Sequence, residues 1–114
     1  MASFKVGSYM YTFDARAGAV EAMVLWSAPS ANAAPQKLAR IAFIDDAAPV
    51  PEPMVTANSS YAEVSFKRSA LAGLVDMLRN ENPVFLTIDK TPIKSVKIGT
   101  EAEPVGEGEP KPAL

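Results

Sequence analysis

Neither histidine nor cysteine occurs anywhere in this chain of 114 residues. The commonest metal ligands, the proton shuttle of neutral pH and the thiol nucleophile are therefore all missing. A serine nucleophile would need another base, and the sequence offers only Lys67 beside Ser65 and Ser69. No acidic run has the spacing of a calcium loop, and no glycine cluster opens a helix as in a phosphate loop. We therefore expect a protein that is not an enzyme, with no catalytic residue, no metal and no cofactor.

Long apolar runs are also lacking. The best run, Ala22–Trp26, is far shorter than the roughly 20 residues that cross a bilayer, so no membrane partner is expected. The sequence also does not begin with a basic region followed by an apolar stretch, which is the pattern of a secretory signal. Together with the missing cysteines, these features favour a cytoplasmic protein.

The sequence also lacks a large excess of charge of either sign, since it has 11 basic and 13 acidic residues and a net charge of −2. The hydrophobic fraction of 48% is typical of a globular domain. The acidic excess lies after Thr100, where Glu101, Glu103, Glu107 and Glu109 accompany several prolines and glycines. We therefore predict a single domain over residues 1–99 and a flexible acidic tail over residues 100–114.

Alternation of apolar and polar residues predicts strands along most of the chain. The expected strands are Phe4–Phe13, Ala19–Ser27, Leu38–Ile44, Ser60–Lys67, Val84–Ile88 and Ile93–Ile98. Between the fourth and fifth of them, an apolar stripe at helical spacing predicts one helix, which ends before Pro83. The expected fold is α+β, with the element order ββββαββ, a mostly antiparallel sheet and one helix packed on one face.

The expected helix carries its stripe on Leu71, Leu74, Val75 and Leu78. Ser69 is the predicted N-cap, because its hydroxyl could accept a hydrogen bond from the first turn. Gly73 costs helix stability relative to alanine, and we interpret it as a position where the helix closely approaches the sheet.

Two features could support binding. Aromatic side chains share one face of the first strand, and they could stack on single-stranded nucleic acid if basic residues lay on the same side. The candidate nucleic-acid-binding residues are Tyr9, Tyr11, Phe13, Lys67, Arg68, Lys94 and Lys97. The alternative, which the near-neutral charge favours, is that these rings pack against the helix. The second feature is the proline-rich segment Pro49–Pro53, which is extended and serves either as a spacer or as a docking segment.

Both faces of Ala19–Ser27 are largely apolar, so a partner subunit is expected to cover one of them. We therefore predict a homo-oligomer, most simply a dimer, although another protein could be the partner. In topology alone, four strands followed by a helix resemble the single-stranded nucleic-acid-binding domains of the plant Whirly proteins. That resemblance also implies a dimer. The function expected first is a non-enzymatic interaction or assembly module, and the alternative is a single-stranded nucleic-acid-binding domain.

Overall fold

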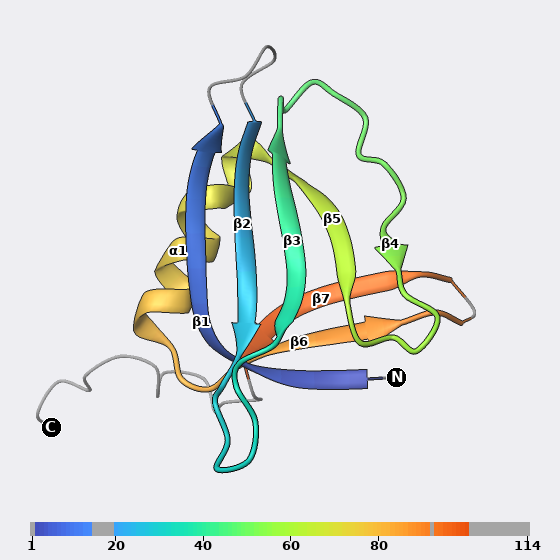
Figure 1. The fold of residues 1–114 in the computed structure, drawn as a ribbon. Helices are drawn as coiled ribbons and strands as arrows, with labels where there is room; N and C mark the ends of the chain where they lie inside the picture. Colours follow the sequence, from blue (N-terminus) through green and yellow to red (C-terminus); the bar gives the residue numbers. More distant parts are fainter. Residues whose placement is uncertain (1, 15–19, 92, 101–114) are drawn as a thin grey trace, which may run out of the picture.

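The computed structural model describes residues 2–14, 20–91 and 93–100, and Figure 1 shows its elements. The strands are β1 (Ala2–Asp14), β2 (Val20–Ser27), β3 (Lys37–Ile44), β4 (Met54–Val55), β5 (Ala62–Lys67), β6 (Val84–Asp89) and β7 (Ser95–Thr100). A 3₁₀ turn, η1 (Arg68–Ala70), leads directly into the helix α1 (Leu71–Asn80). The expected α+β class is confirmed.

The strands form one curled sheet in the order β4-β5-β3-β2-β1-β6-β7. Two details of the predicted sheet were wrong. A short additional strand, β4, lies in the proline-rich connection, and β3 pairs with β5 in parallel, so the sheet is mixed. The physical reason is the length of that connection. It is long enough to carry the chain back along β3, so that β5 starts from the same end of the sheet as β3 (Figure 1).

β1 changes its partner partway along its length. Its first residues, 2–5, pair with β6, whereas residues from Val6 onward pair with β2, with a shift in register between Val6 and Ser8. Gly7 lies at this change of direction. A Cβ atom on Gly7 would come within 2.4 Å of the Cα atom of Ala28, so only glycine lets the two backbones approach this closely.

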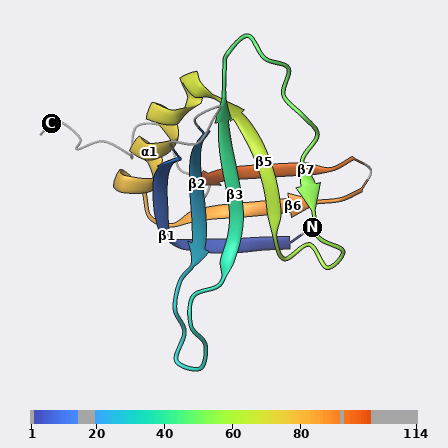
Figure 2. The same cartoon turned by 45° about the horizontal axis from the view of Figure 1, so that its top comes forward.

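The bend in β1 folds the sheet into two layers. Figures 1 and 2 both show β6, β7 and the start of β1 running across the back of β2, β3 and β5. The core lies between these layers, and its largest fully buried side chains are Met23, Leu25, Ile41, Leu86 and Ile88. We call the sheet face toward this core the inner face and the opposite one the outer face.

Helix α1 lies behind β1, on the inner side of the sheet (Figures 1 and 2). Leu74 is 6% exposed, and Leu71, Val75 and Leu78 are partly buried against the same core. The predicted apolar stripe is therefore confirmed.

The predicted cap and the predicted close approach at the helix were both wrong. The hydroxyl of Ser69 caps neither η1 nor α1, and the backbone N–H of Ser69 donates instead to Oδ1 of Asp46, at 2.9 Å. Asp46 lies 23 residues earlier in the chain, so no local pattern could identify it as a cap. Gly73 is exposed, and a Cβ atom there would meet nothing within 4 Å.

Two segments lie outside the described residues. They are the loop between β1 and β2, residues 15–19, and the acidic tail beyond Thr100, which itself ends β7. Within the described part of the chain, no helix is long and apolar enough to cross a membrane.

Candidate interaction site

The aromatic side chains of β1 lie on the inner face, but they are not equally covered. Tyr9 and Tyr11 are partly buried against the core, and the Tyr11 ring lies 6.2 Å from the ring of Phe43. Phe13 lies near the end of the strand and is 72% exposed. Two of the three rings therefore pack inside, and only Phe13 offers most of its surface to a partner.

Phe13 belongs to a small polar and aromatic cluster. Its ring meets that of Tyr11 edge to face at 4.8 Å, and the Tyr11 hydroxyl donates to Oε2 of Glu21 at 2.8 Å. The other carboxylate oxygen of Glu21 pairs with Nε of Arg68 at 3.1 Å. Burial and, secondarily, the bond to Glu21 raise the pKa of Tyr11. This network orients Tyr11 beneath the exposed Phe13 ring.

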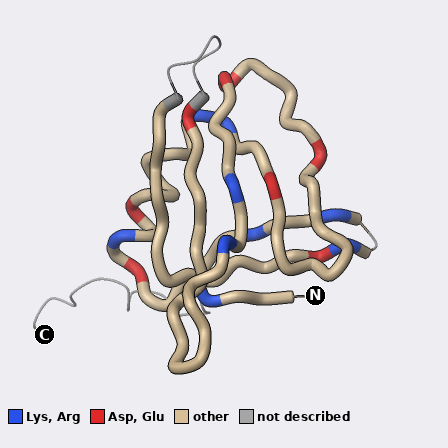
Figure 3. Tube along the Cα trace, in the orientation of Figure 1, with Lys and Arg blue, Asp and Glu red and all other residues tan. Residues whose placement is uncertain are grey.

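The predicted basic residues are dispersed, and only Arg68 joins this cluster. Lys67 donates to the backbone carbonyl of Asp46 at 2.6 Å, and Lys94 pairs with Glu52 at 3.9 Å. Lys97 is exposed on β7, in the other layer. Figure 3 shows basic and acidic residues interspersed over the described chain rather than gathered on one face. The geometry therefore unites Tyr11, Phe13 and Arg68 and leaves the other four candidates apart.

The second half of β1 has an open edge. Among the residues that the structure describes, β1 past Gly7 pairs only with β2, because β6 accompanies β1 no further than Lys5. Two large apolar side chains are exposed along this half, Met10 (53%) on the outer face and Phe13 on the inner face. Residues 8–13 include no proline and no charged residue, the usual protections of an exposed edge. We call this segment, residues 8–13, the β1 edge.

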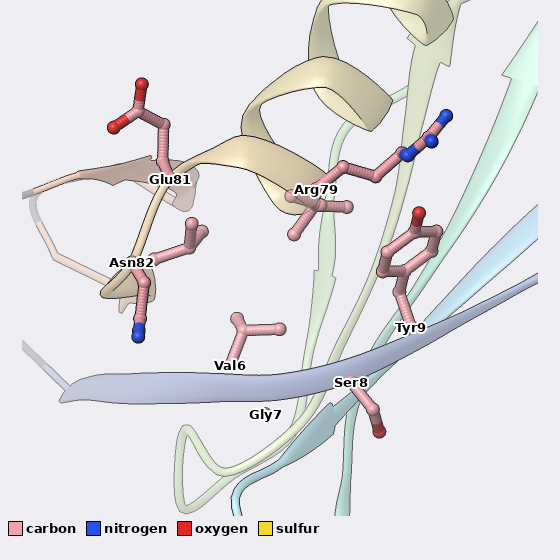
Figure 4. Close-up of a pocket in the computed structure, with 9 residues that line it drawn as sticks. Val6, Gly7, Ser8, Tyr9, Arg79, Glu81 and Asn82 are labelled. Atoms are coloured by element: carbon pink, nitrogen blue, oxygen red, sulfur yellow. The ribbon is translucent and has the colours of Figure 1, made fainter. Parts of the chain in front are cut away.

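A cleft of about 430 Å³ lies where β1 bends (Figure 4). One wall is β1 itself, from Val6 to Tyr9, and the other is the end of α1 with the turn that follows it. The lining residues are Val6, Gly7, Ser8, Tyr9, Leu78, Arg79, Glu81, Asn82 and Val84. That turn contains a cis peptide bond between Asn82 and Pro83. Sequence patterns gave no sign of this cleft, since it joins segments that are about 70 residues apart in the chain.

The segment Pro49–Pro53 lies over the gap between the two layers. Val50, Pro51 and Pro53 line an apolar hollow of about 370 Å³ together with Phe66 of β5 and Val96 of β7. The segment is part of the connection from β3 to β4. Its use as a docking segment for a partner stays a prediction.

No group of three or more acidic residues that could hold a metal ion occurs in residues 2–14, 20–91 and 93–100. Comparison of the chain with protein-family models, with curated proteins and with solved structures gave no match. The case for a function therefore depends on the surfaces described above.

Proposed function

We propose that this protein is a non-enzymatic interaction and assembly module that pairs with a second copy of itself through the β1 edge. The observation that carries the proposal is that, within the described part of the chain, this half of β1 has a strand partner on one side only, while Met10 and Phe13 are exposed along it. Unpaired backbone groups beside apolar side chains form a ready template for another strand.

A second copy is the partner that fits this edge most simply. Two identical strands can pair antiparallel about a two-fold axis. Every contact between two residues then occurs twice, once in each direction, and the dimer leaves no half of the interface open. Such pairing would extend the sheet from one subunit into the next and cover the apolar side chains on both faces of β1. The proposed dimer also fits a reducing cytoplasm, since its contacts need no disulfide.

Light scattering coupled to size exclusion tests this assembly. The wild-type protein should have twice the chain mass of 12.1 kDa. Phe13→Lys places a charge on the β1 edge, in the way natural edge strands avoid pairing, and should give a monomer. Ile93→Lys is the matched control, because Ile93 is 73% exposed but lies away from this edge, and it should stay dimeric. A monomeric wild type, or equal effects of the two variants, would overturn the proposal.

Single-stranded nucleic-acid binding is a second candidate, favoured by one observation. The exposed Phe13 ring lies near Arg68, which is linked to it through Tyr11 and Glu21, so a base could stack beside a cation. Fluorescence anisotropy with a labelled oligothymidine at low salt tests this function. Phe13→Ala and Arg68→Gln should each weaken a salt-sensitive signal, and Lys94→Gln should leave it unchanged. No binding at low salt removes this candidate.

A further inference from the structure

The cleft at the bend of β1 combines an apolar floor with polar groups from both walls (Figure 4). We propose that it binds a carboxylate carried on a short apolar chain, as at the C-terminal residue of a peptide. The cleft volume, about 430 Å³, falls within the roughly 300–1,000 Å³ that is usual for ligand sites. This inference does not require the proposed dimer, although Ser8 and Tyr9 belong both to the cleft and to the β1 edge.

The floor of the cleft would receive the apolar chain. Val84 is buried, at 4% exposed, and Val6 and Leu78 are partly buried against the core. These three side chains come from β6, β1 and α1, so the packing of the two layers and the helix fixes the shape of the floor. Covering their remaining apolar surface favours a ligand with an aliphatic side chain.

Arg79 would bind the carboxylate. Its guanidinium group offers a planar fork of donors that matches a carboxylate, and among the described residues Arg79 takes part in no ion pair. Tyr9 lies at the same end of the cleft and presents a hydroxyl that can donate a second hydrogen bond (Figure 4). One cation and one neutral donor thus come from opposite walls.

The other charged and polar groups at the cleft are compatible with this arrangement. Glu81 also lines it, but in Figure 4 its carboxylate points away from Arg79. The carbonyl groups that end α1 carry a partial negative charge, and Arg79, in the last turn, offsets it. Asn82 lies toward the other end of the cleft, where its amide can bond the peptide group that precedes a C-terminal residue (Figure 4).

An NMR titration of the ¹⁵N-labelled full chain tests the proposal with two probes that differ only in charge. N-acetyl-leucine should shift the backbone signals of residues 6–9 and 78–84, and N-acetyl-leucinamide should bind about tenfold more weakly, as expected for the loss of one charged hydrogen-bonding partner. Arg79→Gln should reduce the affinity for N-acetyl-leucine by a similar factor. Arg40→Gln is the matched control, because Arg40 lies on the outer face of β3, and it should bind like the wild type.

Three further comparisons complete the test. Tighter binding of N-acetyl-leucine than of 4-methylpentanoate supports a peptide terminus as the ligand, whereas equal binding supports a free carboxylic acid, and both agree with the proposed chemistry. Phe13→Lys should still bind, which separates this site from the proposed assembly. The proposal is overturned if acid and amide bind alike, or if Arg79→Gln binds like the wild type while its spectrum shows the native fold.

Discussion

The bend of β1 at Gly7 positions both the open edge and the cleft, so replacing Gly7 tests the architecture on which both proposals depend. In Gly7→Ala, the new Cβ atom would lie 2.4 Å from the Cα atom and 2.6 Å from the backbone nitrogen of Ala28. These neighbours are backbone atoms, so no rotamer change relieves the clash and the two strands must separate. Overpacking usually costs about 1–3 kcal/mol, and we expect the upper end of that range here.

Urea unfolding, followed by circular dichroism, measures this cost. With a slope of roughly 1–3 kcal/mol per molar urea, the midpoint for Gly7→Ala should fall by about 1–3 M while the slope stays the same. Gly73→Ala is the matched control, because a Cβ atom there meets nothing within 4 Å. In an exposed helix position, alanine should raise the free energy of unfolding by about 1 kcal/mol. Equal midpoints for the two variants would refute the described path of β1.

Substitutions at three other positions test the packing and the polar contacts. Leu74→Ala should lower the free energy of unfolding by about 2–5 kcal/mol in the same urea assay, because it opens a cavity beneath α1. Asp46→Ala should cost about 1 kcal/mol by removing the acceptor for the Ser69 N–H, whereas Asp46→Asn should recover most of that loss. Burial, aided by the 3.0 Å hydrogen bond to Glu63, raises the pKa of Tyr61 to about 12. The stability that this shift contributes should be complete below pH 10 and be lost as the pH rises toward 12. Because the pKa of Tyr11 is raised as well, an ultraviolet titration of Tyr61→Phe should lose one late-titrating tyrosine relative to the wild type.

Local sequence patterns were sufficient to predict the helix and the longer strands, because their inward-facing side chains recur at a regular spacing along the chain. The spacing of Leu71, Leu74 and Leu78 places one helix face toward a core wherever that core lies, so the helix could be predicted. Alternation likewise identified the strands, because the two-residue period of a strand is a property of its own backbone.

Contacts between distant segments could not be predicted in this way. The parallel pairing of β3 with β5 depends on the path of a long connection, and β4 is only two residues long. The cap of Ser69 by Asp46 and the cleft at Arg79 are both made by segments that meet only after folding. Gly7 was the one local sign of the bend in β1, and a glycine within a strand pattern often marks such an irregularity.

Pairing of the β1 edge with a second copy is the central claim, and the absence of native cysteine allows a direct test by crosslinking. Single-cysteine variants at each of residues 8–13 place one thiol in turn at every position along the edge. Antiparallel pairing about a two-fold axis places one residue of the edge opposite its own counterpart, within the range of a disulfide. Under mild oxidation, the cysteine variant at that residue should form a covalent dimer much faster than Ile93→Cys, whose thiol is also exposed but lies away from the edge. If none of the six crosslinks faster than Ile93→Cys, the proposed pairing is wrong.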